Sequence, residues 1–196
     1  MEMNVRITLI EDALGMMPAN KEIHETYIAS KAPDAPKIQE EIEAIGVEQM
    51  VEKTMTVFPK LADGTPFFWD YQLRGFFKDS MGMLRRLKDK KCSKITSYKK
   101  VVDGLIFIEQ RKVPIKLEGP MGDCQRPLRA DTMQGPRVAI AHSETVPAGS
   151  TLEFTINILD DSLKGVVEEC LDYGRLRGLG QWRNSGAGRF TWEEVD

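Results

Sequence analysis

The sequence predicts an α+β protein with a ferredoxin-like (RRM-like) fold, in which an antiparallel sheet carries two helices on one face. Four short segments have the apolar alternation or β-branched runs of strands, and two longer segments repeat apolar residues at the helical period. They follow one another as strand, helix, strand, strand, helix, strand, which is the ferredoxin-like order. Because 196 residues suit one domain, we expect a single domain over residues 1–196, with insertions at about 15–66 and 111–145.

The first half of the chain supplies one strand and one helix. The stretch "VRITLIED" alternates apolar and polar residues and predicts the first strand. Residues 15–66 contain five prolines, so we expect an insertion there, with one helix near 38–51. The stretch "FWDYQLRGFFKDSMGMLRRLKDKK" repeats apolar residues near the 3.6 period, which predicts the first helix with Asp70 as its N-cap. Its outer side carries basic residues: Arg74, Lys78, Arg85 and Lys88.

The second half supplies the other four elements. The apolar, β-branched run "VVDGLIFIE" predicts the second strand. The Pro-, Gly- and Arg-rich range 111–145 predicts a long insertion with short strands, and "TLEFTINILD" then alternates as a third strand. The stretch "DDSLKGVVEECLDYG" has apolar residues at helical spacing and predicts the second helix, capped by Asp161 or Ser162. After a glycine-rich stretch, "RFTWEEV" predicts the last strand.

Composition restricts the class of protein. The chain is 41% hydrophobic and 29% charged, and no apolar run approaches the ~20 residues of a membrane helix. We therefore expect a soluble protein without a membrane partner. The N-terminus lacks the basic region and cleavage site of an export signal, which favours a cytoplasmic location. The three cysteines are odd in number and far apart, so we expect reduced thiols and predict neither a metal nor a cofactor.

Charge is distributed unevenly along the chain. The formal net charge of −3 argues against nucleic-acid binding by the surface as a whole. Between Glu22 and Glu52, however, eight acidic residues face two lysines, and between Arg74 and Lys100 ten basic residues face two acidic ones. Each run is compatible with a solvated face, and the basic run is also compatible with a binding surface.

The stretch "GLGQWRNSGAGRF", residues 178–190, contains two Gly-x-Gly pairs. A Rossmann turn or Walker loop follows a strand and opens a helix, whereas this stretch follows a helix and precedes a strand, so we exclude mononucleotide binding by either motif. Backbone N–H groups of such a turn could bind an anion, and arginine forks match phosphate oxygens. Trp182 could stack on a base, an interaction of roughly 1–3 kcal/mol. The alternative is a glycine-rich turn with Trp182 in the core.

This stretch resembles the glycine-rich loop of the RAMP superfamily, the ferredoxin-like RNA-binding proteins of CRISPR systems, at each of its four glycines. The stretch "ETVPAGSTLEFTINI" is similar to the start of a strand in the backbone subunits of type III CRISPR effector complexes. The stretch "FFWDYQLRGFFKDSMGMLRR" lies where those subunits carry a leucine- and arginine-rich helix, although their preceding Pro-Gly-Ser-Ser is missing here. The chain also resembles small proteins of bacteriophages.

The resemblance implies a protein that grips single-stranded RNA, or DNA, by its phosphates and stacks into a filament with itself or with CRISPR-type subunits. It implies a bacterial cytoplasm, or that of a phage-infected cell. The expected nucleic-acid-binding residues are Gly178, Gly180, Trp182, Arg183, Asn184, Ser185, Gly186, Gly188 and Arg189 of the loop, with Arg74 and Lys78 of the first helix.

The leading hypothesis is a binding protein without catalysis. Type III backbone subunits cut RNA with a metal-assisted aspartate in a loop after the first strand; here Asp34 is the candidate, but no matching motif surrounds it, which favours a solvated loop acid. His24 and His142 are candidates for general acid–base chemistry, and neither lies in a motif. Two alternatives remain: a metal-dependent endoribonuclease, or a phage protein that inhibits or mimics a CRISPR complex through protein contacts.

Overall fold

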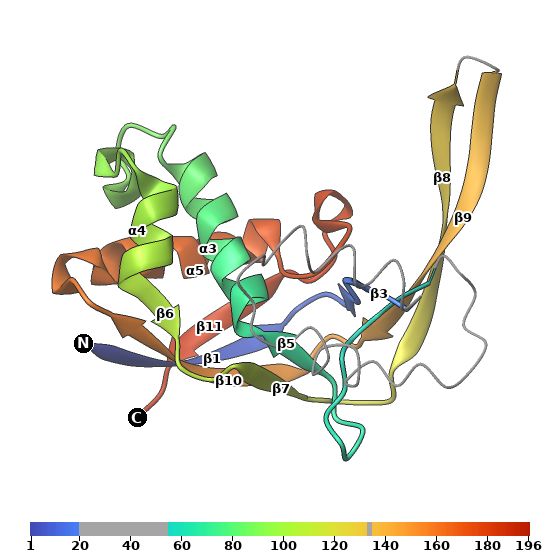
Figure 1. The fold of residues 1–196 in the computed structure, drawn as a ribbon, viewed down its shortest axis with the longest axis horizontal. Helices are drawn as coiled ribbons and strands as arrows, with labels where there is room; N and C mark the ends of the chain where they lie inside the picture. The colour runs from blue at the N-terminus through green and yellow to red at the C-terminus, as the bar shows by residue number, and fades with distance from the viewer. Residues whose placement is uncertain (20–54, 133–134) are drawn as a thin grey trace.

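The computed structural model describes residues 1–19, 55–132 and 135–196, and the helix expected near 38–51 lies outside them. The described chain is an α+β fold in which three helices lie on one side of a six-stranded main sheet (Figure 1). The sheet has the order β11-β1-β10-β7-β5, and β6 also pairs with β10. Its strands are β1 (Glu2–Leu9), β5 (Phe67–Trp69), β6 (Ile106–Ile108), β7 (Lys112–Lys116), β10 (Thr151–Ile158) and β11 (Phe190–Glu194).

The predicted ferredoxin-like order is confirmed. The elements β1, α3 (Asp70–Leu84), β6, β10, α5 (Lys164–Arg177) and β11 follow one another as strand, helix, strand, strand, helix, strand. All pairs in the main sheet are antiparallel, with β1 between β10 and β11. The apolar residues that alternate along β1 are buried toward the helices, and those of β10 match them across the ladder, where Val5 faces Phe154.

The other face of the main sheet is polar. Between its buried residues β1 presents Asn4, Arg6 and Thr8 on this face. Arg6 forms ion pairs with Glu153 at 2.7 Å and Glu193 at 2.9 Å. The helices therefore cover one face, and on the opposite face Arg6 joins the carboxylates of the two neighbouring strands.

Two helix caps differ from the sequence prediction. Asp70 is the first residue of α3 and Trp69 is the N-cap, whose N–H donates to the side-chain oxygen of Gln72 at 2.9 Å. Before α5 a short 3₁₀ turn is capped by Asp160, which accepts the N–H of Ser162 at 3.0 Å. Before α5 the capping oxygen comes from the residue preceding the expected pair, whereas at α3 the side chain of Gln72, inside the helix, accepts the N–H of the N-cap residue.

The second predicted strand is mostly a helix. Residues 101–105 belong to α4 (Tyr98–Leu105), and only Ile106–Ile108 pair as β6. Val102 of α4 is fully buried, and three neighbours at helical spacing pack partly buried against the core: Tyr98, Val101 and Leu105. The β-branched run indicated a strand, but burial of this helical stripe decides the local structure.

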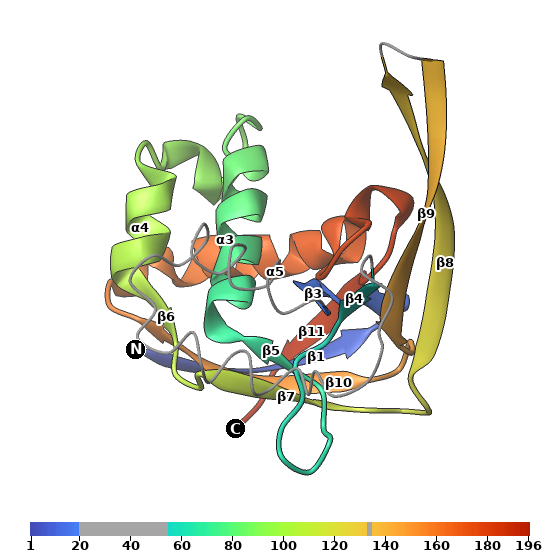
Figure 2. The same ribbon diagram turned by 45° about the vertical axis from the view of Figure 1, so that its right-hand side comes forward.

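A smaller second sheet carries a long hairpin. It has the order β2-β9-β4-β3, with β8 paired to β9 and β4 parallel to β9. Its strands are β2 (Ala13–Leu14), β3 (Met17–Pro18), β4 (Met55–Val57), β8 (Gly122–Thr132) and β9 (Gly135–Val146). The β8–β9 hairpin extends away from the helices and the main sheet, as both ribbon views show (Figures 1 and 2). The range 111–145 thus contains β7, which joins the main sheet, and nearly all of this hairpin.

Candidate nucleic-acid interface

The glycine-rich stretch forms a loop between the C-terminal end of α5 and β11, next to the base of the β8–β9 hairpin (Figures 1 and 2). All four glycines have positive φ: 73° at Gly178, 80° at Gly180, 96° at Gly186 and 68° at Gly188. Glycine enters this region without the steric cost that a Cβ brings. The four-glycine pattern therefore encodes the path of the backbone.

The base of the loop is closed on itself. The N–H of Leu179 donates to the carbonyl of Gly188 at 2.8 Å, and the N–H of Gly188 donates to the carbonyl of Asp12 at 2.8 Å. A Cβ added at Gly188 would lie 1.9 Å from the Leu179 oxygen, and one at Gly178 would lie 2.5 Å from the Ala187 oxygen. These two glycines thus allow the backbone segments at the two ends of the loop to approach each other. Residues 181–187, which we call the loop tip, project beyond this closed base.

Trp182 stands on the loop tip in an unusual conformation. It is the one non-glycine residue with positive φ in the described chain, at 55°, and its side chain is 46% exposed. Trp182 is therefore not in the core, contrary to the alternative left open by the sequence. A large side chain in this region is a genuine outlier, and such strain persists only where surrounding contacts hold it.

Arg126 of β8 holds one face of the Trp182 ring. Its guanidinium carbon lies 5.2 Å from the ring centroid, although Arg126 itself is only 7% exposed. It donates to Ser143 Oγ at 2.9 Å and to Gln181 Oε1 at 3.1 Å. No carboxylate pairs with Arg126 within the described residues. The hairpin thus places a buried, unneutralised cation behind the indole ring.

Two arginines connect the loop to helix α3. The Nε of Arg177 and the Nη1 of Arg183 both donate to Oδ2 of Asp79, at 2.7 and 2.9 Å. The hydrogen bond to Asp79 raises the pKa of the Arg177 guanidinium above its ordinary value. Arg177 also donates to Asn184 Oδ1 at 2.7 Å. The loop tip is thereby tied to α3, and its two nearest cations share one carboxylate.

The remaining loop residues support this shape. The hydroxyl of Ser185 and its N–H both donate to the carbonyl of Trp182, at 2.8 and 3.0 Å. The carbonyl of Arg189 accepts the N–H of Ile10 at 2.8 Å, and the buried Arg189 Nε has no hydrogen-bond partner among the residues that the structure describes. The N–H of Gly186 donates to Arg183.

Arg74 and Lys78 lie apart from the loop. Both pair with Asp103 of α4, at 3.2 Å from Arg74 Nη2 and 2.5 Å from Lys78 Nζ. At 100° per residue, Arg74 is about 140° around α3 from Asp79. The structure therefore brings Trp182 and Arg183 together with Asp79, and places the two basic residues of the first helix on the side of α3 that faces α4.

The catalytic candidates do not form a site in the part of the chain that is described. Asp34 and His24 lie outside the described residues. His142 is on β9, where its carbonyl accepts the hydroxyl of Thr56. Within the described ranges, no group of three His, Cys, Asp or Glu residues could hold a metal ion. The three cysteines are free thiols, and the buried Cys92 and Cys170 have their sulfur atoms 4.0 Å apart.

Three residues of the interface were missed by sequence reasoning. In the sequence, Asp79 is one acidic residue of a predicted helix, and Gln181 lies between two glycine pairs. Arg126 is one of several basic residues in a predicted insertion. Arg126 and Gln181 are 55 positions apart, and Asp79 and Arg183 are 104 apart. Only the fold brings these pairs together, so no local pattern signals them.

No protein-family model and no curated protein matches the sequence. The fold is similar to that of a chain in the cryo-EM structure of Type III-B Cmr-beta bound to cognate target RNA, with a TM-score of 0.55 and 12% identity over 100% of this chain and 58% of that one. It is also similar to a chain of a Type IV-B CRISPR complex, with a TM-score of 0.51 and 12% identity over 100% of this chain and 90% of that one.

The protein therefore spans little more than half the length of the Cmr-beta chain that it resembles. At this level of identity the likeness concerns the fold. Among the helices described, none combines the length and apolar character needed to span a bilayer.

Proposed function

We propose that this protein binds single-stranded RNA through the loop tip without cutting it, as a subunit of a CRISPR-type assembly that stacks along the strand. The observation that carries the proposal is Trp182, held half exposed at positive φ against the buried Arg126. The shared fold supports the setting, since one similar chain belongs to a structure with bound target RNA. In this proposal residues 1–196 are one domain, to which the hairpin is added.

The loop tip suits an unpaired base better than the sheet does. RRM-like sheets bind RNA by stacking bases on aromatic side chains of their open face. Here the open face of the neighbouring strands β11, β1 and β10 carries polar and charged residues and no aromatic ring: β1 presents Asn4, Arg6 and Thr8, β10 presents Glu153 and Thr155, and β11 presents Thr191 and Glu193. The exposed part of the Trp182 ring offers a stacking surface that these three strands lack.

Trp182 is already positioned for stacking. Because Arg126 covers one face of the ring, a base can stack on the exposed side without ordering a mobile side chain first, which lowers the entropic cost of binding. Every base has a π-face, so this contact tolerates sequence variation and contributes roughly 1–3 kcal/mol. Two positive charges favour the phosphates on either side of that base: Arg126, which has no ion-pair partner among the described residues, and Arg183, which shares Asp79 with Arg177.

The test is fluorescence anisotropy with labelled single-stranded RNA, single-stranded DNA and duplex of ~30 nucleotides per strand at several salt concentrations. Trp182→Ala should weaken binding to the single strand roughly 5- to 150-fold. The salt dependence should not change, since stacking involves no counterion release. The matched control is Trp192→Ala, which removes a partly exposed tryptophan of β11 that hydrogen-bonds Asp172 on α5.

Circular dichroism on both variants separates loss of contact from loss of fold. If Trp182→Ala binds RNA like the unaltered protein, the loop tip is not the binding site. If the unaltered protein binds no nucleic acid, a phage protein that contacts a CRISPR complex becomes the better explanation. Cleavage of the labelled RNA with magnesium would instead indicate the endoribonuclease. Light scattering on the complex tests for several copies per strand.

A further inference from the structure

A second cationic surface lies at the free end of the helical layer, where α3 turns into α4 (Figures 1 and 2). Residues 85–100, which we call the basic cap, comprise the turn after α3, the short helix η1 (Lys91–Lys94) and the start of α4. The cap contains eight basic residues and one acidic residue, Asp89, a net charge of +7 in a chain of net charge −3. All eight are exposed: Arg85, Arg86, Lys88, Lys90, Lys91, Lys94, Lys99 and Lys100.

These cations form no ion pair with the described residues. In the described chain the ion pairs of lysine and arginine fall outside the cap, as with Arg6, Arg74 and Arg183. None of the eight cap residues has a carboxylate within ion-pair distance among the described residues. Concentrated charge of one sign raises the local electrostatic potential and attracts a polyanion.

The cap is also held in place. The carboxylate of Glu169 on α5 accepts the N–H of Lys91 at 2.8 Å and the N–H of Cys92 at 3.0 Å. Cys92 is fully buried between these elements. At the other end Arg85 donates to the carbonyl of Thr96 at 3.2 Å, and its guanidinium lies over the ring of Tyr98. The lysines therefore project from an ordered scaffold.

We infer that the basic cap binds the sugar–phosphate backbone of a nucleic acid, single or double stranded, independently of Trp182. Lysines act as point charges toward phosphates and do not read bases. A protein partner fits this surface less well, because stable protein interfaces have an apolar centre and are depleted in lysine. Leu87, 52% exposed, is the largest apolar exposure within the cap.

The cap and the loop tip therefore predict separable behaviour. The inference goes beyond the proposed function, because duplex nucleic acid should bind to the cap although it offers no unpaired base to Trp182. Lysine contacts with phosphate release counterions, and each contact to duplex DNA contributes about 0.9 to the slope of log K against log salt.

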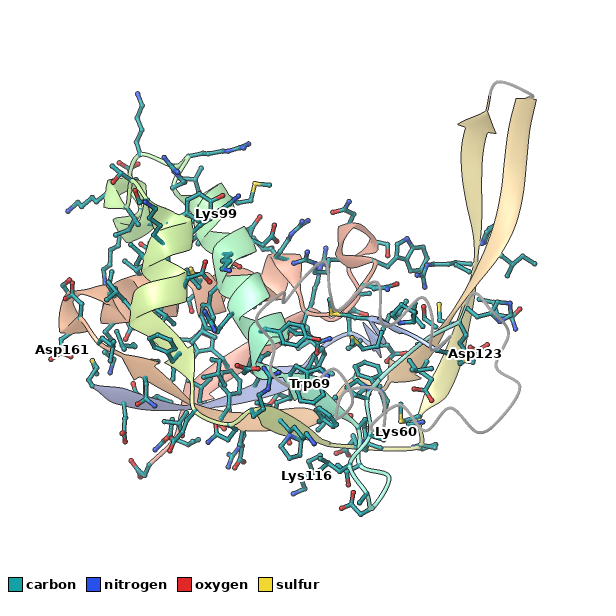
Figure 3. All side chains as sticks on the ribbon, viewed as in Figure 1. Lys60, Trp69, Lys99, Lys116, Asp123 and Asp161 are labelled. Atoms are coloured by element: carbon teal, nitrogen blue, oxygen red, sulfur yellow. The ribbon has the colours of Figure 1, made fainter. Side chains whose placement is uncertain are left out.

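The experiment uses the full chain with two variants matched in net charge. In the cap, Lys88→Gln with Lys90→Gln removes two positive charges. The control, Lys116→Glu, changes the net charge by the same amount at an exposed lysine of β7 on the opposite side of the sheet from Lys99 (Figure 3). Duplex binding is measured by anisotropy over a series of salt concentrations, with charge-matched polyglutamate as a competitor.

For duplex, the cap variant should lower the salt slope by up to about 1.8, whereas the control leaves it unchanged. Equal slopes in the two variants, or no binding of duplex to the unaltered protein, would overturn the inference. Competition by polyglutamate as effective as by duplex would overturn the assignment to nucleic acid. Trp182→Ala is measured in parallel on single-stranded RNA. If the cap variant weakens binding of the single strand and Trp182→Ala does not, the loop tip is rejected and the cap is retained. If Trp182→Ala weakens binding of the single strand and the cap variant leaves the duplex slope unchanged, the cap is rejected and the loop tip is retained.

Discussion

Asp79 should oppose RNA binding while it stabilises the fold. Its Oδ2 accepts hydrogen bonds from both Arg177 and Arg183. A phosphate that approaches these arginines must share them with, or take them from, a fixed carboxylate of the same charge. Asp79→Asn keeps the shape of the side chain and removes its charge. We therefore expect this change to tighten binding of single-stranded RNA and to lower the stability of the free protein.

The magnitude follows from the exposure of the ion pairs. The three side chains are between 24% and 28% exposed, so each pair is partly screened by water. Pairs of this kind contribute up to about 1 kcal/mol each. Removing both ion pairs of Asp79 should therefore make the free energy of RNA binding more favourable by about 1–2 kcal/mol, which is roughly 5- to 30-fold tighter binding. The free energy of unfolding should fall by a similar amount.

The assay compares Asp79→Asn with Asp103→Asn by anisotropy and by urea unfolding. Asp103 is a matched control, because it pairs two cations, Arg74 and Lys78, on the side of α3 that faces α4. Both variants change the net charge equally, so only a greater gain in affinity for Asp79→Asn supports the loop tip. Weaker binding in Asp79→Asn would refute the reasoning and show that Asp79 orients the arginines. An equal gain in Asp103→Asn would extend the site to Arg74 and Lys78.

Two further predictions concern the scaffold of these surfaces. Gly188→Ala should lower the free energy of unfolding by more than about 2 kcal/mol, because the added Cβ would lie 1.9 Å from the Leu179 oxygen. The control Gly64→Ala, at a position with φ of 87° and open space around it, should lower it by only about 1 kcal/mol through backbone strain. Similar decreases of the urea midpoint in the two variants would contradict this reasoning. Burial would raise the pKa of Glu169, but hydrogen bonds from two N–H groups of η1 lower it below its ordinary 4.5. Its contribution to stability is therefore present above about pH 4.5 and is lost as pH falls through the folded pKa. The stability difference between the unaltered protein and Glu169→Gln should shrink steadily as the pH is lowered below 4.5, and a constant difference would show that charge is not its cause.

The fold could be predicted because its main elements have strong periodicity. The alternation in β1 and β10 and the helical spacing in α3 and α5 survive in the structure, since each of these elements buries one face in the same core. The second sheet gave no such signal. Strands β2 and β3 have two residues each, too few to alternate, and they exist because β9 and β4 are placed beside them. Tertiary pairing creates these strands.

The glycine motif predicted where in the chain the candidate site lies, but not which of its groups are exposed to solvent. Gly-x-Gly pairs suggested backbone that approaches phosphate, whereas the space left by Gly178 and Gly188 is filled by the loop's own backbone. What projects toward solvent is Trp182, and its orientation depends on Arg126 of the hairpin. A motif fixes local backbone geometry, and the contacts of its side chains are decided by distant segments.

The two surfaces should act at different steps of binding. The cap carries a net charge of +7 and forms no ion pair with the described residues, so its field reaches into solvent over the Debye length of about 8–10 Å. Arg177 and Arg183 share the carboxylate of Asp79, which lowers their combined charge from +2 to +1, so they attract less from a distance than the cap does. Trp182 acts only on contact. The double lysine variant should therefore slow association in stopped-flow experiments, and Trp182→Ala should speed dissociation. If both variants changed only the dissociation rate, the cap would be a contact surface without a steering role.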